Sequence, residues 1–225
     1  LAAEDYDVSL QWDWVPYDTN PNLWMVEQIE AAFAGPGQSP SALIVTIPSQ
    51  LVADKLVLLT GAGAPIFGLN SGYDKAEYAG LLNFFGQHEL HAGTVAGRTM
   101  FADLQNCNNS RISFVDHLAG TNSALTARLD GFTNTLRALA NTARCSSLMV
   151  ELLSLDPADN RGRTQDILHA VTMAVSGDTD TCSFDGILTN GADTADDVYK
   201  LLPGRCFSRL SSFGTFDSSA SAQQM

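Results

Sequence analysis

The sequence predicts an α/β protein built from two doubly wound lobes, each with a parallel sheet. Short apolar runs alternate with segments of helical periodicity along most of the chain, which is typical of βα units. The run at 43–47, LIVTI, is apolar throughout, as expected for a strand that is covered on both faces. Polar residues follow these runs, at the sheet edge where open α/β folds bind ligands.

In the first part of the chain, apolar runs predict strands at 8–15, 43–47, 65–69 and 81–86. A helix is expected over 23–33, because apolar residues recur there at helical spacing and Asn22 can cap its start. A second helix is expected over 51–60 and ends at Gly61. A helix rich in small residues follows the polar segment Gln87-His88-Glu89.

After a polar loop near 100–111 the alternation resumes. Strands are expected at 112–117, 148–155, 184–190 and 211–216, and helices at 122–139, 164–175 and 192–202. We therefore place an N-terminal lobe at 1–103 and a C-terminal lobe at 104–225, with a loose polar tail from about 218.

Composition restricts the partners. The chain has 225 residues, is 45% hydrophobic and carries a net charge of −13. This charge argues against nucleic acid and anionic membranes, which both require basic surface. No apolar run approaches the roughly 20 residues that span a bilayer, so direct membrane insertion is not expected. A neutral or cationic small ligand fits the charge better, as does a role of the charge in solubility alone.

The four cysteines lack the CxxC spacing of zinc or redox motifs. Each lies in a polar loop before an expected strand, and such loops share one edge of a parallel sheet. We predict the pairs Cys107–Cys145 and Cys182–Cys206, which imply an oxidising compartment. The alternative is four free thiols in a cytosolic protein. A glycosylation sequon at Asn108 agrees with secretion.

The residues that follow the expected strands are rich in amides and carboxylates, with one arginine. Such planar groups can each engage two neighbouring hydroxyls, so they suit polyhydroxylated ligands. The candidate ligand-binding residues are Asn70, Ser71, Asn122, Arg128, Asn190 and Asp217. Alternatives remain open: Arg128 can be a surface residue paired with Asp130 or Asp193, and Asn70 can cap the helix that follows it.

Signals of catalysis are missing. His88, His91 and His117 have no HxxxH or HExxH frame, and we interpret them as partly exposed polar residues. Gly61-Ala62-Gly63 follows a helix and does not continue as a phosphate-binding loop. A GxSxG elbow is also absent from the sequence. We predict no catalytic residue, metal ligand or cofactor, and a protein that is not an enzyme.

Several runs together resemble one family. GLNSG at 68–72, FGQHELHAG at 85–93, RLDGF at 128–132, DGILTN at 185–190 and GTFD at 214–217 resemble the type 1 periplasmic sugar-binding proteins, particularly the ribose-binding branch. The resemblance covers about 7–217, in the same order and spacing. It implies that the first strand of the N-terminal lobe and the return segment are missing, so that both lobes are incomplete.

The resemblance also implies roles for individual residues. Asn70 stands where a strand-end Asp or Asn bonds sugar hydroxyls. Arg128 matches the arginine that bridges ligand hydroxyls, and Asp217 matches a carboxylate of the second lobe. Gly191-Ala192 departs from the family, which often has Asn-Asp there.

The function expected from the resemblance is binding of a sugar or sugar-like molecule between two closing lobes, for uptake or sensing through a membrane transporter or receptor. The location would be extracellular, periplasmic or in the cell envelope. The alternative is the effector-sensing core of a lac-repressor-type transcription regulator, which shares the fold. The acidic charge, the cysteines and the lack of a helix-turn-helix segment weigh against it.

Overall fold

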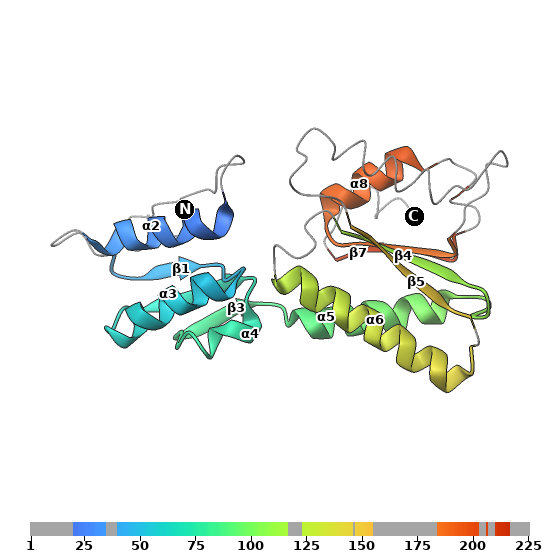
Figure 1. The fold of residues 1–225 in the computed structure, drawn as a ribbon, viewed down its shortest axis with the longest axis horizontal. Helices are drawn as coiled ribbons and strands as arrows, with labels where there is room; N and C mark the ends of the chain where they lie inside the picture. Colours follow the sequence, from blue (N-terminus) through green and yellow to red (C-terminus); the bar gives the residue numbers. More distant parts are fainter. Residues whose placement is uncertain are drawn as a thin grey trace, which may run out of the picture. The chain divides into compact units, whose positions relative to one another are not determined.

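The computed structural model describes residues 20–34, 40–116, 123–145, 147–154, 184–202, 206 and 210–216. They form helices and parallel strands, which confirms the predicted α/β class. The chain divides into two compact units, Leu1–Gly86 and Gln87–Met225 (Figure 1). The strand expected at 8–15, the helix expected at 164–175 and the tail from 218 lie outside the described residues. None of the described helices is long and apolar enough to cross a membrane.

The first unit begins with helix α2, Pro21–Ala34. The side chain of Asn20 accepts hydrogen bonds from the backbone N–H groups of Asn22 (3.1 Å) and Leu23 (3.3 Å). The capping residue is therefore Asn20, and the prediction of Asn22 was wrong. The helix begins at Pro21, two residues before the predicted start. Proline is favoured at this first helical position, because the N–H that it lacks would have no partner within the helix.

Three parallel strands form the sheet of the first unit in the order β1-β2-β3. Helix α3 joins the first two strands, and the short helix α4 joins the last two. The bounds are Leu43–Val45 (β1), Gln50–Gly61 (α3), Ile66–Asn70 (β2), Tyr73–Ala76 (α4) and Asn83–Gly86 (β3). Helix α3 is capped by Ser49, whose side chain accepts from the backbone N–H of Val52.

The core of the first unit lies against one face of this sheet. Val45 and Ile66 pack with Leu56 of α3 and Ile29 of α2, and all four are buried. Because side chains alternate along a strand, Ile44 and its neighbours on β2 and β3 point to the other face.

An exposed hydrogen bond joins the turn that follows α4 to helix α3. The Tyr78 hydroxyl donates to Asp54 Oδ1 at 2.7 Å, and Gln50 Nε2 donates to the same oxygen at 2.8 Å. The bonds from Gln50 and Tyr78 lower the pKa of Asp54, and the bond to Asp54 raises the pKa of Tyr78. Because folding lowers the pKa of Asp54, its carboxylate stabilises the folded state at pH values above the ordinary pKa of an aspartate. This stabilisation is lost as the pH falls through the pKa that Asp54 has in the folded protein.

Replacing Tyr78 by phenylalanine is expected to raise the pKa of Asp54 toward its ordinary value, because one of the two donors is removed. An NMR titration of the Asp54 carboxyl carbon measures this. Replacing exposed Tyr73 by phenylalanine is the control and should leave the pKa of Asp54 unchanged. An unchanged Asp54 titration in the Tyr78 variant would contradict the contact.

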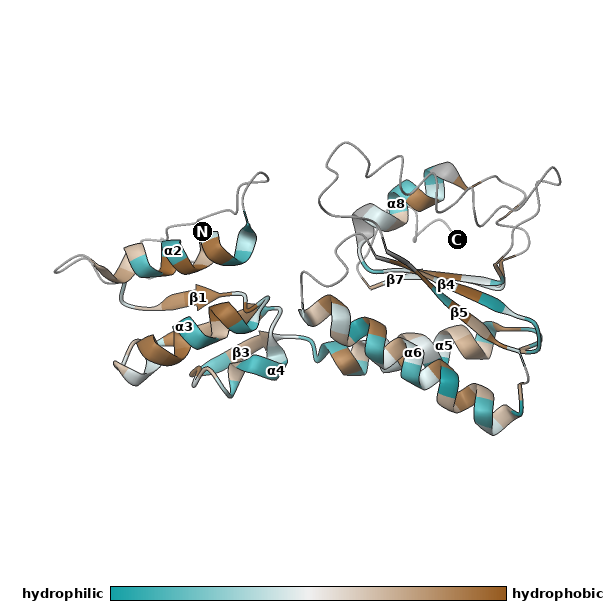
Figure 2. Cartoon of the chain, in the orientation of Figure 1, coloured by the Kyte–Doolittle hydropathy of each residue, from teal (hydrophilic) through white to brown (hydrophobic). Residues whose placement is uncertain are grey.

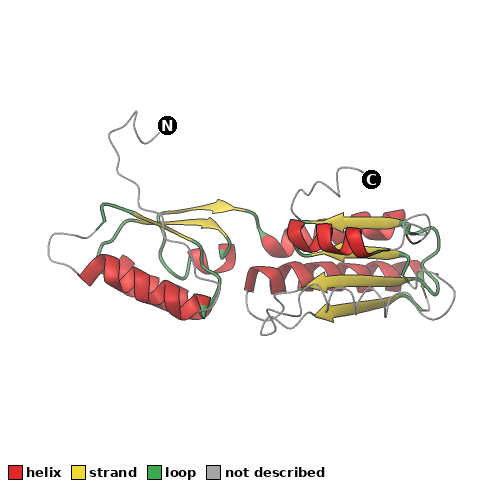
Figure 3. Cartoon of the chain, turned by 90° about the horizontal axis from the view of Figure 1, so that it is seen from above, coloured by secondary structure: helices red, strands yellow, loops and turns green. Residues whose placement is uncertain are grey.

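The second unit has a four-stranded parallel sheet in the order β5-β4-β6-β7. Its helices lie on both faces, with α5 and α6 on one and α8 on the other (Figures 1 and 3). The bounds are Glu89–Asp103 (α5), Arg111–Asp116 (β4), Ser123–Ala143 (α6), Met149–Ser154 (β5), Gly186–Thr189 (β6), Ala192–Leu201 (α8) and Ser212–Thr215 (β7). This is the doubly wound arrangement that the alternation predicts.

The core of the second unit joins α5 and α6 to the sheet. Phe114 of β4 packs against Phe132 of α6 with ring centroids 5.6 Å apart, and Met100 of α5 and Leu136 of α6 belong to the same buried cluster. Hydrophobic and hydrophilic residues alternate along α6 (Figure 2), and its buried residues Phe132, Leu136 and Ala140 recur at intervals of four. One stripe of α6 thus faces the sheet, as its helical spacing predicts.

The division of the chain between the two units falls before α5. We expected the boundary near residue 103, which would assign this helix to the first lobe, but the second unit begins at Gln87. The reason is the close packing of α5 on α6, through glycines described below.

A disulfide joins Cys107 and Cys145, which confirms the first predicted pair. The two cysteines lie in the loops that precede the neighbouring strands β4 and β5, as the shared-edge argument requires. Cys206 is disulfide-bonded as well. Cys182, its predicted partner, lies outside the described residues.

Candidate functional site

A buried ion pair lies between the two helices that cover one face of the second sheet. Arg128 of α6 donates from Nε to Glu89 Oε2 at 2.5 Å and from a terminal nitrogen, Nη2, to Glu89 Oε1 at 3.3 Å. The side chains of Arg128 and Glu89 are only 8% and 5% exposed. Arg128 is therefore not a surface residue paired with Asp130 or Asp193, and that alternative is wrong.

Glu89 is stabilised by its place at the start of helix α5 as well as by its ion pair with Arg128. It is the first residue of α5, where the helix dipole favours a negative charge. Gln87 Nε2 donates to Glu89 Oε2 at 2.8 Å. Both carboxylate oxygens of Glu89 are thus engaged within the protein.

Glycines allow the two helices to approach closely enough for this pair to form. A Cβ on Gly93 of α5 would lie 2.1 Å from the backbone oxygen of Arg128, and a Cβ on Gly131 of α6 would lie 2.1 Å from that of Leu90. These contacts are reciprocal and involve backbone, so no side chain can move aside to make room. The sequence places glycine where each helix touches the backbone of the other.

Replacing Gly131 by alanine is expected to lower the free energy of unfolding of the second unit by about 1–3 kcal/mol, the usual range for overpacking. The added methyl must push α5 away from α6. Urea unfolding followed by circular dichroism measures the effect. Gly61 at the end of α3 is the control, because its Cβ would meet nothing within 4 Å. Equal stabilities of the two alanine variants would contradict the close contact.

The amide of Asn190 is buried beside this ion pair. Asn190 follows β6, is 3% exposed, and its backbone oxygen accepts a hydrogen bond from Arg128 Nη1 at 3.2 Å. Its backbone N–H donates to Val115 of the neighbouring strand β4 at 3.1 Å. The side-chain Nδ2 and Oδ1 are buried and have no hydrogen-bond partner in the structure. A buried polar group without a partner costs about 1–3 kcal/mol, so this amide needs an explanation.

Phe216, just after β7, completes the cluster. The guanidinium carbon of Arg128 lies 5.1 Å from the centre of the Phe216 ring, a cation–π distance. A guanidinium has five N–H donors, and three of those of Arg128 make the hydrogen bonds described above. We name Glu89, Arg128, Asn190 and Phe216 the arginine cluster.

In the first unit, Asn70 and Ser71 lie at the carboxyl end of β2. Asn70 has a left-handed backbone, φ 65°, and is exposed, a conformation that asparagine tolerates better than most residues. It does not cap α4, since the capping position is Gly72 and has no side-chain bond. The backbone oxygen of Ser71 accepts from the Ile47 N–H at 2.9 Å, which ties this edge to the segment after β1.

The other candidates are less informative. Asn122, Asp217 and His117 lie outside the described residues. His88 caps α5 by accepting from the backbone N–H of His91 at 3.3 Å, which is a structural role. In the described parts of the chain no three His, Cys, Asp or Glu residues gather as metal ligands would.

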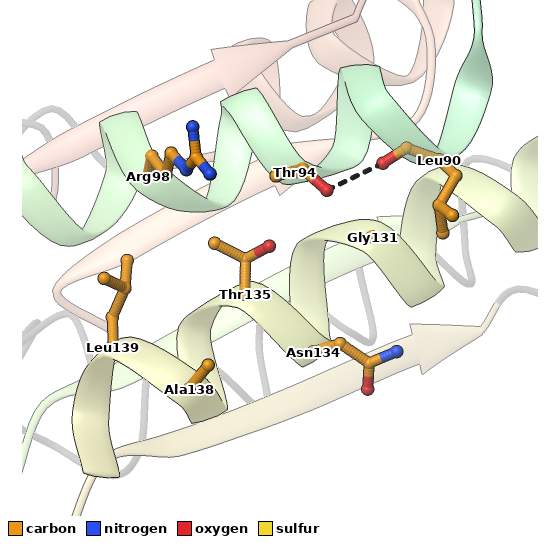
Figure 4. A pocket seen from close by; sticks show the side chains of 8 residues that line it. All are labelled: Leu90, Thr94, Arg98, Gly131, Asn134, Thr135, Ala138 and Leu139. Carbon is orange, nitrogen blue, oxygen red and sulfur yellow. Dashed lines mark hydrogen bonds between the residues drawn. The ribbon is translucent and has the colours of Figure 1, made fainter. Parts of the chain in front are cut away.

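An open hollow of about 370 Å³ lies between α5 and α6 (Figure 4). Leu90, Thr94 and Arg98 line it from α5, and Gly131, Asn134, Thr135, Ala138 and Leu139 from α6. The Thr94 hydroxyl is already bonded to Leu90 O at 3.0 Å. The exposed surface of the hollow is mainly apolar, although Arg98, Asn134 and Thr135 also line it. Because the hollow is open, it would bury little of a small ligand. The arginine cluster is the better candidate site.

Solved structures of sugar-binding proteins and regulators are similar to this chain. A carbohydrate transporter from Acidothermus cellulolyticus, in complex with myo-inositol, has a TM-score of 0.68 at 20% identity over 95% of this chain and 64% of its own. A periplasmic sugar-binding protein of an ABC transporter from Legionella pneumophila has 0.71 at 17% identity, over 96% and 80%. A putative LacI transcriptional regulator from Bacteroides fragilis has 0.68 at 16%, over 95% and 67%.

The chain has a type 1 periplasmic-binding-protein-like fold. It spans less than two thirds of the length of the Acidothermus protein. No model of a protein family and no curated protein sequence matched the chain. The similarity is thus one of fold, and it agrees with the resemblance in the sequence motifs.

In this periplasmic-binding-protein-like chain, the structure brings together two of the six residues predicted for the site, Arg128 and Asn190. Sequence reasoning missed Glu89 and Phe216 as members of the cluster. A carboxylate at the first position of a helix was visible in FGQHELHAG, but its pairing with an arginine 39 residues later was not.

Proposed function

We propose that this chain belongs to a solute-binding protein that takes up a sugar or sugar-like molecule at the carboxyl ends of its parallel strands. The neighbours in fold are binding proteins and regulators rather than enzymes, which supports a binding role. The described residues include no cluster suited to metal chemistry. The proposed activity is recognition of a ligand, on the grounds of the neighbours in fold.

The observation that carries the proposal is the unpaired amide of Asn190 beside Arg128. The amide offers two N–H donors and a carbonyl acceptor, all buried, and the guanidinium has N–H donors left over. Adjacent hydroxyls of a sugar both donate and accept, so they can satisfy both groups at once. A ligand without those hydroxyls leaves the buried groups unpaired, which gives the site its selectivity.

Asn70 and Ser71 are the proposed contacts from the first unit, because they end β2 at the edge where such folds bind ligands. Asn122 and Asp217 are proposed as further contacts on the grounds of the sequence resemblance. Binding by lobe closure is proposed on the same grounds.

Replacing Asn190 by leucine is expected to weaken sugar binding at least about tenfold, roughly 1.4 kcal/mol. The same change should raise the free energy of unfolding of the ligand-free protein by about 1 kcal/mol, since it removes an unpaired buried amide. Calorimetric titration with myo-inositol, ribose, glucose, galactose and xylose measures binding, and urea unfolding measures stability.

The control is Asn134→Leu, which alters an exposed amide on α6 and should leave binding unchanged. Absence of saturable heat across the whole panel with the unaltered chain would refute sugar binding. Equal affinities of the unaltered chain and the Asn190 variant would remove Asn190 from the site.

We further propose an extracellular, periplasmic or cell-envelope location, with delivery of the ligand to a membrane transporter or receptor. The Cys107–Cys145 disulfide supports it, because such bonds persist in oxidising compartments. The effector core of a LacI-type regulator is the second candidate, since one neighbour in fold carries that description. Thiol titration of protein isolated without reductant separates them: a cytosolic regulator should show four free thiols.

A further inference from the structure

The charge of Arg128 is already balanced before any ligand arrives. Glu89 is the only charged residue in the described parts of the chain that contacts its guanidinium, and the two side chains are less than 10% exposed. Water screens such a buried pair little. A ligand that reaches this site therefore meets hydrogen-bond donors with no net positive charge.

The pair is held by backbone contacts as well as by its own hydrogen bonds. Gly93 lies against the backbone of Arg128, and Gly131 against that of Leu90, the residue after Glu89. Glu89 is also held by Gln87. Separating the two charges requires that these side chains leave a packed helix contact, and each charge would then be buried without a partner.

We propose that Glu89 is a specificity-determining residue, which cancels the charge of Arg128 and so restricts the site to uncharged polyhydroxylated ligands, excluding sugar acids and sugar phosphates. This inference rests on the proposed function. An anionic group beside Arg128 would face the Glu89 carboxylate, and like charges in a poorly screened site repel strongly. A neutral hydroxyl pays no such penalty and still accepts from Arg128 and pairs with the Asn190 amide.

Glu89→Gln is the direct test, because glutamine keeps the shape and an acceptor oxygen but removes the charge. The unaltered chain should show no saturable binding of inorganic sulfate, whereas the glutamine variant should bind it through the uncompensated guanidinium. With sugars, the ratio of affinities for glucose over glucuronate should fall at least about tenfold in the variant, a change of roughly 1.4 kcal/mol. Calorimetric titration measures both, and circular dichroism checks that the variant is folded.

A matched control removes a carboxylate from another ion pair of the same unit. Arg111 of β4 donates to Glu151 of β5 at 2.6 Å, and both side chains are about one third exposed. Glu151→Gln changes the net charge equally and should not change the ratio for glucose over glucuronate. The double variant Glu89→Gln/Arg128→Gln should lose the sulfate binding that the single variant gains.

Two results would overturn the inference. One is a folded Glu89→Gln variant that binds neither sulfate nor glucuronate better than the unaltered chain. The other needs no variant: an unaltered chain that binds glucuronate or glucose 6-phosphate as tightly as glucose. If the unaltered chain binds no sugar but the variant gains sulfate, the proposed function fails, while the charge balance by Glu89 stands.

Discussion

Replacing Arg128 by methionine is expected to lower the free energy of unfolding of the second unit by about 3–5 kcal/mol, the range for breaking a buried ion pair. Methionine fills a similar volume but leaves the Glu89 carboxylate 5% exposed without its partner. The variant also loses the contact with Phe216 and the bond to the Asn190 oxygen. This makes it one of the two most disruptive changes that we predict.

Urea unfolding followed by circular dichroism, with hydrogen exchange to assign the change to the second unit, measures the effect. The double variant Glu89→Leu/Arg128→Met is the control. It should recover to within about 1 kcal/mol of the unaltered chain, because replacing both ions by apolar groups is often nearly neutral. A single variant with unaltered stability would show that the pair is solvated in solution.

Removing the Cys107–Cys145 disulfide by a double change to serine is expected to lower the free energy of unfolding by about 4 kcal/mol, from the loop-closure relation for this spacing. The cysteines are 38 residues apart and enclose β4 and α6. The effect arises mainly in the unfolded chain, which gains freedom when the link is lost.

The folded loops should stay in place in this variant. Asn109 N–H donates to Ser147 Oγ and Ser147 Oγ donates to Asn109 Oδ1, both at 2.8 Å, so hydrogen bonds also join the two loops. Comparing urea midpoints of the double serine variant and the oxidised chain measures the loss. Serine at both positions is preferable to a reductant, since Cys206 is disulfide-bonded too. Equal midpoints would contradict the prediction.

Local patterns determined the elements. The apolar run LIVTI and the helical spacing of Phe132 and Leu136 predict a strand and a helix close to those observed, because burial on one face imposes the period. The pairing of Cys107 with Cys145 followed from the same reasoning, since loops before neighbouring parallel strands share an edge. The fold class and one disulfide could thus be predicted from sequence.

The composition of the site could be predicted only in part. Arg128 and Asn190 were predicted because polar residues at strand ends and the family motifs single them out. Glu89 was not, since nothing in the local sequence indicates which carboxylate an arginine 39 residues away will contact. The unit boundary before α5 was missed for the same reason, because the packing of α5 on α6 is a contact between distant segments.

The sequence by itself determined that the chain alternates helix and strand, that its strands end in polar residues, and that Cys107 and Cys145 are paired. Only the tertiary structure decided that α5 belongs to the second unit and that Glu89 balances Arg128 while the Asn190 amide stays unpaired. The physical reason is range: periodicity records which face of an element is buried, whereas charge balance depends on which elements meet.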